Sequence, residues 1–180
     1  LGKFNRTGCP EEWGEFIRRF AKHYRGRVRY MEVWNEPDIN TFGRNPERYL
    51  KLLRIAYNET KKNAPEMLVM TGGVSGMVTT DQQTAFVRKM LRDGKKHYDI
   101  IAFHGHGSLS SYLTHLNPLL AARKEFGVTA PWYANETAEP SNWSSETGQA
   151  VTLFKKLLVS WARGSIGYNW YDLRNDGFDP

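Results

Sequence analysis

Two glutamates in this sequence, Glu36 and Glu136, share a context that could support catalysis. Each follows an asparagine at the end of an aromatic-rich run, as "YMEVWNE" and "PWYANE". Two carboxyl groups about 5 Å apart suit cleavage of a glycosidic bond by double displacement, one as acid/base and one as nucleophile. The acid must hold its proton near neutrality while the nucleophile stays ionised, so their surroundings must differ. The alternative is that each glutamate simply ends a strand or caps the next helix.

The elements that must position these glutamates follow a regular alternation of strand and helix patterns. Strands are expected at 28–34, 67–73, 98–107, 131–136 and 165–172, and helices at 9–26, 45–64, 81–94, 110–127 and 146–164. We expect Asn45 and Asp81 to cap their helices, Gly94 to close the third helix and Pro118 to break the fourth. Strict alternation predicts parallel strands with right-handed crossovers, in one domain spanning residues 1–180.

Two α/β architectures fit this alternation, an open doubly wound sheet and a (β/α)8 barrel of the TIM type. The first needs a glycine-rich phosphate loop, and the candidate "TGGVSG" lacks the required spacing. Polar residues instead end strand after strand, where barrels build their active sites. These residues are Asn35 and Glu36, His104 and His106, Asn135 and Glu136, and Asp172. The sequence therefore predicts a partial barrel of about five β/α units, because five strands cannot close a barrel of eight.

Three of these segments resemble the clan A retaining glycoside hydrolases. "EVWNEPD" is similar to their acid/base strand, "YDIIAFHGHG" to their sixth strand, and "PWYANETAEP" to their seventh strand, which carries the nucleophile. Together they most resemble family 39, the β-xylosidase and α-L-iduronidase group, with this chain corresponding to strands four to eight. The resemblance implies a retaining O-glycosidase that needs no metal or cofactor. It leaves the first three barrel strands without a counterpart.

The resemblance also implies roles for individual residues. By position, Glu36 would be the general acid/base and Glu136 the nucleophile. Asn35 would hydrogen-bond the sugar 2-hydroxyl, and His104 would line the sugar pocket. His106 lies where iduronidase-like members carry a basic residue able to meet a sugar carboxylate, and this difference puts uronic-acid specificity in doubt.

Further candidates come from the residues themselves. Trp170, near the end of the last strand, is a candidate platform for stacking on a sugar ring, with core packing as the alternative. Trp143 follows the nucleophile strand and could flank an outer subsite or pack at the rim. Glu139 competes with Glu136 as nucleophile, but it falls three residues further on, in the loop.

Two residues of the strand that leads to Glu36 are expected to face the barrel interior. Glu32 should point inward, where a carboxylate needs a partner. Trp34 is a candidate for the apolar wall beside Glu36. His104 and His106 are two residues apart without a clear third ligand, so no metal site is expected.

The composition narrows the classes of molecule that the chain is expected to bind. The net charge is +6, but the basic residues are spread along the expected helices without a nucleic-acid recognition motif. No apolar run approaches the roughly 18 residues that span a bilayer, and the single Cys9 excludes an internal disulfide. We therefore expect a carbohydrate substrate and neither nucleic acid nor membrane as partner. The sequence does not fix the localisation, although a secreted or periplasmic site would suit polysaccharide degradation.

The open edges of the partial barrel form a separate expectation. Unpaired strands at 28–34 and 165–172 favour association, so a homodimer partner or an N-terminal segment should complete the barrel. The start at Leu1 rather than Met indicates that the natural start is missing. The alternative function is a catalytically incomplete carbohydrate-binding fragment, or a partial barrel that needs a partner chain.

Overall fold

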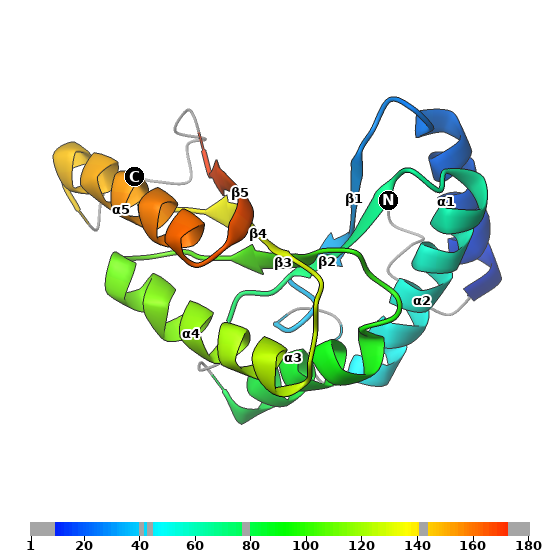
Figure 1. Cartoon of the computed structure of the whole chain (residues 1–180), viewed down its shortest axis with the longest axis horizontal. Helices are drawn as coiled ribbons and strands as arrows, with labels where there is room; N and C mark the ends of the chain where they lie inside the picture. Colours follow the sequence, from blue (N-terminus) through cyan, green and yellow to red (C-terminus); the bar gives the residue numbers. More distant parts are fainter. Residues whose placement is uncertain (1–9, 40–41, 43–44, 77–79, 141–143, 173–180) are drawn as a thin grey trace.

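The structure, a computed structural model, describes residues 10–39, 42, 45–76, 80–140 and 144–172. Within these ranges five helices and five strands alternate, as the sequence predicts (Figure 1). The helices are α1 (Pro10–Tyr24), α2 (Pro46–Asn63), α3 (Asp81–Gly94), α4 (Leu109–Glu125) and α5 (Glu146–Ala162). The strands are β1 (Tyr30–Asn35), β2 (Leu68–Gly73), β3 (Ile101–His104), β4 (Trp132–Thr137) and β5 (Ser165–Trp170). No helix in these ranges combines the length and the apolar character needed to cross a bilayer.

The strands form a parallel sheet in sequence order that does not close. β1 pairs with β2, and β4 lies between β3 and β5. Isolated parallel bridges, Met70 with Ile100 and Val74 with Phe103, join β2 to β3. Figure 1 shows β1 and β5 at the two ends of this sheet. The predicted partial (β/α)8 barrel of five units is therefore confirmed.

Side chains alternate between the two faces of the sheet. Residues of the helix-facing side, such as Val33, Phe103 and Trp132, are buried in one large core with residues of α1 to α4. On the other face Met70 and Ala102 belong to a small second cluster. This alternation, typical of strands, separates a packed outer core from the inner face that leads to the strand ends.

The helix termini test the predicted caps. Asn45 caps α2 as predicted, because its side-chain oxygen accepts a hydrogen bond from Arg48 N at 3.0 Å. The predicted cap at Asp81 is wrong: Thr80 has the extended backbone of a cap, and its hydroxyl accepts from Gln83 N at 3.1 Å. Asp81 is the first helical residue instead, where its negative charge still favours the helix N-terminus.

The predicted break at Pro118 is also wrong. α4 continues through the proline, although a proline inside a helix costs about 3 kcal/mol. Buried side chains lie on both sides of it, Tyr112 and Leu116 before and Leu119 and Ala122 after. Each large apolar side chain contributes about 1.5–3 kcal/mol when buried, so packing of both halves against the sheet outweighs the local penalty.

Helix α5 presents an apolar stripe to solvent. Its exposed large side chains are Val151, Phe154, Leu158 and Trp161. The buried residues of the same helix are polar, Lys156 and Ser160. The helix therefore packs on the sheet with a mixed face and leaves an apolar face without cover from the described part of the chain.

Candidate active site

Polar side chains converge at the carboxyl ends of the strands. Glu36 follows β1, His104 ends β3, His106 lies two residues beyond it, and Glu136 belongs to β4. Each of the four offers an oxygen or nitrogen atom, and these atoms all lie within 4.8 Å of one another. Strand β3 is shorter than the predicted 98–107 and ends at His104, so His106 projects from the loop that follows. We call these four residues the polar cluster.

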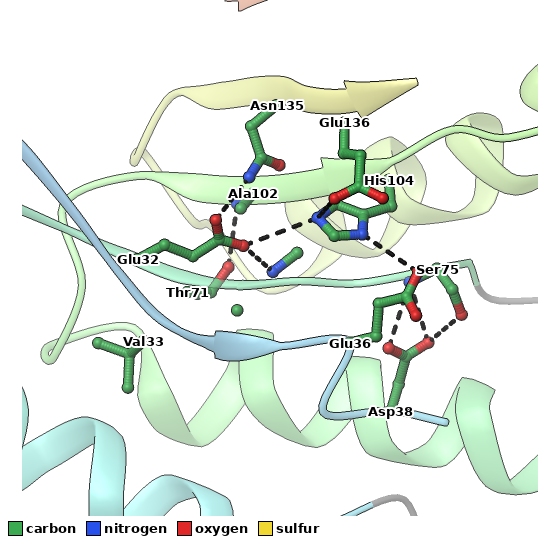
Figure 2. Close-up of polar contacts among 12 residues, drawn as sticks. Glu32, Val33, Glu36, Asp38, Thr71, Ser75, Ala102, His104, Asn135 and Glu136 are labelled. Carbon is green, nitrogen blue, oxygen red and sulfur yellow. Dashed lines mark hydrogen bonds and ion pairs between the residues drawn. The ribbon is translucent and has the colours of Figure 1, made fainter. Parts of the chain in front are cut away.

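His104 lies at the centre of the polar cluster. Its side chain is only 1% exposed, and Nδ1 lies 3.1 Å from Oε1 of Glu36. Nε2 lies 3.8 Å from Glu136 and 3.7 Å from Glu32. Figure 2 shows the carboxylates of Glu36 and Glu136 on opposite sides of this ring. Burial alone would lower the pKa of His104, but the three surrounding carboxylates outweigh burial and raise the pKa to about 9. At neutral pH the ring is therefore an imidazolium.

Glycine at the end of β2 makes room for this ring. A side chain at Gly73 would occupy the space filled by the His104 imidazole. The paired glycines of "MLVMTGG" are thus explained by packing rather than by a phosphate loop. The backbone N–H of Gly73 in turn donates to Glu32 Oε1 at 2.7 Å.

His106 holds Glu136 in its ionised form. The imidazole Nε2 lies 3.2 Å from Glu136 Oε1 and 4.0 Å from Glu36 Oε1. The hydrogen bond from His106 lowers the pKa of Glu136, and the charge of His104 acts in the same direction, together exceeding the opposing effect of burial. A carboxylate that stays ionised in a half-buried site is the form that a nucleophile requires.

Glu32 finds the partners that its inward position demands. Oε1 accepts from Gly73 N, and Oε2 accepts from Asn135 Nδ2 at 2.8 Å. The carboxylate thereby links β1 to β2 and β4 on the inner face, beside His104 (Figure 2). The prediction that Glu32 points inward and needs partners is confirmed.

The backbone before Glu36 is strained. Trp34 and Glu36 both have positive φ, 78° and 44°, on either side of Asn35. Non-glycine residues rarely adopt this conformation, and such strain is concentrated at functional sites. The Trp34 ring packs edge-on against Phe42, with centroids 5.1 Å apart. The ring also packs against the large helix-facing core, so the expected interior position of Trp34 is wrong, and its part in an apolar wall beside Glu36 stays a prediction.

Several solved structures of glycoside hydrolases resemble this chain. A family 39 glycoside hydrolase from the gut symbiont Bacteroides cellulosilyticus WH2 superposes with a TM-score of 0.73 at 23% identity, covering 91% of this chain and 37% of its own. A family 39 β-xylosidase from Caulobacter crescentus gives 0.65 at 19% identity, covering 91% and 38%. An exo-β-1,4-mannosidase from Opitutaceae bacterium strain TAV5 gives 0.63 at 15% identity, covering 90% and 32%. The chain has the fold of part of a (β/α)8 barrel, similar to the barrels of these glycoside hydrolases. No protein-family model and no curated protein matches the sequence.

This chain spans less than two-fifths of the length of those two family 39 chains. The strands that are present carry both glutamates of the polar cluster. The likeness therefore covers the part of the barrel in which the predicted catalytic pair lies.

Other predicted residues of the partial barrel lie outside the polar cluster. The ring centroid of Trp170 is 5.7 Å from Lys156 Nζ, and its stacking on a sugar stays a prediction. Asn35 is exposed at the end of β1, and its bond to a sugar hydroxyl also stays a prediction. Glu139 is 8% exposed and its Oε2 has no hydrogen-bond partner. Trp143 lies outside the described residues.

Asp38 supports the site although its role was not predicted from the sequence. This fully buried carboxylate accepts hydrogen bonds from the N–H and the hydroxyl of Ser75, at 3.1 and 2.8 Å for Oδ2. Burial raises the pKa of Asp38, and the bonds from Ser75 oppose the rise. The contact ties the turn after Glu36 to the end of β2. Its sequence signal was the aspartate directly after Asn-Glu-Pro.

The polar cluster also has the composition of a metal site. No clear third ligand beside His104 and His106 was expected from the sequence, but the fold brings Glu36 and Glu136 to them. Two imidazoles and two carboxylates are ligands that zinc accepts. Because the His104 ring holds a proton at neutral pH, a cation would first have to displace it.

His104 should make the stability of the chain depend on pH. The folded state raises its pKa from 6.5 to about 9, so the stabilisation is fully present below about pH 6.5 and is lost as the pH rises through about 9. We expect His104→Gln to be less stable than the original chain by a few kcal/mol near pH 6, with the gap shrinking toward about pH 10. Urea unfolding across this range measures it. The exposed His23→Gln is the control, and a gap that does not vary with pH would contradict the prediction.

Proposed function

We propose that this chain carries the catalytic pair of a retaining glycosidase that hydrolyses O-glycosidic bonds. The observation that supports the proposal is that carboxylate oxygens of Glu36 and Glu136 lie within 4.8 Å of each other. Retaining enzymes have carboxyl groups about 5–5.5 Å apart, whereas inverting enzymes need about 6.5–9.5 Å to admit a water molecule. The short separation favours double displacement.

In this mechanism the two glutamates have different tasks. Glu36 gives a proton to the glycosidic oxygen while Glu136 attacks C1, so that the alcohol leaves and a glycosyl ester forms on Glu136. Glu36, now a carboxylate, then takes a proton from a water molecule that attacks C1. This second step breaks the ester, releases the sugar with its anomeric configuration retained and restores both glutamates. The pairing of Glu136 with His106 supports its role as the nucleophile, because this pairing keeps the carboxylate ionised.

The surroundings of the pair favour an uncharged sugar. His106 occupies the position where a basic residue could meet a sugar carboxylate, but its Nε2 lies against Glu136. The imidazolium of His104 is likewise surrounded by Glu32, Glu36 and Glu136. Both imidazoles are thus engaged with carboxylates of the chain, so we propose a neutral glycoside, bound at its 2-hydroxyl by Asn35, as substrate.

Trapping of the glycosyl ester tests the proposal. We expect a panel of activated 2-deoxy-2-fluoro-glycosides to label the chain once, because the fluorine slows both formation and hydrolysis of the glycosyl ester, whereas the good leaving group speeds only its formation, so that the ester accumulates. Peptide mass spectrometry should place the label on Glu136. Glu136→Gln should abolish labelling, and Glu139→Gln should retain it. A label on Glu139, or on no carboxylate, would contradict the assignment.

Unpaired edges and exposed apolar surface favour a second candidate function. Neither β1 nor β5 pairs on its outer side with any strand in the described residues, and α5 exposes the apolar stripe of Val151, Phe154, Leu158 and Trp161. We propose as the alternative a catalytically incomplete carbohydrate-binding piece, active when a second copy or an N-terminal segment completes the barrel. Sugar binding without labelling, followed by labelling once the missing strands are supplied, would select this alternative.

A further inference from the structure

Lys156 is a buried cation on the sheet-facing side of α5. The residue is 0% exposed, although much of α5 around it is open to solvent. Its Nζ donates to Gly105 O at 2.8 Å and to Ala138 O at 2.9 Å. Moving an ammonium group out of water is expensive unless it is bonded on all sides. Helix α5 exposes several large apolar side chains and buries this lysine instead. Packing of apolar surface therefore does not explain why Lys156 is buried.

The two carbonyls that Lys156 binds belong to the segments that carry the polar cluster. Gly105 lies between His104 and His106, and Ala138 lies two residues after Glu136. The N–H of Gly105 also donates to Glu136 O at 2.8 Å. One ammonium group thus joins the segment that follows β3 to the segment that follows β4.

The surroundings of Lys156 hold the ammonium in place. Its Nζ lies 5.4 Å from the ring centroid of Tyr112 and 5.7 Å from that of Trp170, distances at which a cation is attracted to an aromatic face. Burial lowers the pKa of Lys156 to about 8, while the charge of Glu139 opposes this effect. These contacts arise from α4, β5 and the loop after β4, so the group is enclosed by four elements including its own.

We propose that Lys156 is a positioning residue that fixes His106 against Glu136 by bonding the carbonyls of Gly105 and Ala138. The inference rests on the proposed function, in which Glu136 is the nucleophile and must stay ionised. Without the ammonium, the buried carbonyl of Gly105 and the partly buried carbonyl of Ala138 lose this donor, and leaving such groups without a hydrogen bond is unfavourable. The two segments would separate to reach water, and the contact between His106 and Glu136 would lengthen.

The test uses Lys156→Met, which keeps an unbranched side chain only one atom shorter and removes its hydrogen-bond donors. Carbon-13 NMR of the Glu136 carboxyl follows its titration in the complete chain, whether or not the chain is active. We expect the pKa of Glu136 to rise toward its ordinary value, because the bond from His106 that lowers it is weakened. The exposed neighbour supplies a matched control, Lys155→Met, which should leave this titration unchanged. An unchanged Glu136 titration in a folded Lys156→Met variant would overturn the proposal.

Two further measurements keep the proposal testable. If Lys156→Met does not fold, nitrogen-15 NMR of the unaltered chain should show a slowly exchanging ammonium signal at Lys156 and a fast one at Lys155. Equal exchange at both lysines would overturn the inference. In a form that turns over aryl glycosides, Lys156→Met should lower kcat by about tenfold to a hundredfold with little change in KM, as expected when a reacting group is displaced by about 1 Å. Labelling of Glu136 tests the proposed function separately, so the two failures are distinguishable.

Discussion

Replacing Glu136 by alanine is expected to lower kcat for aryl glycosides by about 10⁴-fold or more, because the variant has no group to form the glycosyl ester. The loss should be similar for all aryl leaving groups, since attack on C1 precedes every product. Steady-state rates across a series of aryl glycosides measure it. The fold should survive, because Glu136 is half-exposed and its side chain contacts histidines rather than the core.

Chemical rescue distinguishes loss of the nucleophile from general damage. The alanine variant leaves a space beside C1, and a small anion such as azide can attack there in place of the carboxylate. We expect azide to restore turnover and to give a glycosyl azide of inverted configuration, because only one displacement then occurs. Glu139→Ala is the matched control and should need no rescue. Restored turnover with retained configuration would show that Glu136 does not attack C1.

The convergence of Glu36 and Glu136, the proposed catalytic pair, could be predicted from the sequence because it follows from topology. Parallel strands joined by crossovers place all their carboxyl ends at one edge, so Glu36 and Glu136 meet although they lie far apart in the chain. The inward position of Glu32 was predictable for a related reason, since alternate residues of a strand share a face. Local chemistry likewise predicted the cap at Asn45, whose signal lies within three residues.

What the sequence did not reveal depends on contacts between distant segments. The burial of His104 among three carboxylates requires the space left by Gly73 on the neighbouring strand, and no local pattern encodes that distance. The continuity of α4 through Pro118 depends on packing on both sides of the proline. The proline in the sequence indicates the free-energy cost of continuing the helix. Only the tertiary structure shows the packing energy that outweighs this cost.

The burial of helix α5 also could not be predicted from the sequence. Apolar residues at Phe154, Leu158 and Trp161 have the spacing of a helix face that packs in a core, yet in the structure they are exposed. Lys156 and Ser160 are buried instead, the former by its bonds to two strand ends. Periodicity identifies an apolar face without identifying its neighbour. In a partial barrel the neighbour of a terminal helix is not among the described elements.

Replacing Glu36 by glutamine should have an effect that depends on the leaving group, unlike the change at Glu136. Glutamine keeps the shape of the side chain but cannot give a proton to the departing oxygen. We expect kcat/KM to fall by about 10²–10⁴-fold for alkyl glycosides, whose leaving groups need protonation. The dinitrophenolate of a dinitrophenyl glycoside leaves without protonation, so formation of the glycosyl ester from these substrates should be nearly unaffected.

The second step distinguishes acid catalysis from a loss of geometry. In the proposed mechanism Glu36 is also the base that activates water, so the glycosyl ester on Glu136 should accumulate in Glu36→Gln. Rapid mixing with a dinitrophenyl glycoside should then show a burst of phenolate followed by slow turnover. Glu32→Gln is the matched control, because Glu32 also lies beside His104 but bonds Gly73 and Asn135. In Glu32→Gln the fall in kcat/KM should be equal for all leaving groups, and rapid mixing should show no burst of phenolate. The same uniform loss in Glu36→Gln would contradict its role as acid/base, since removal of a proton donor should slow basic leaving groups much more than weakly basic ones.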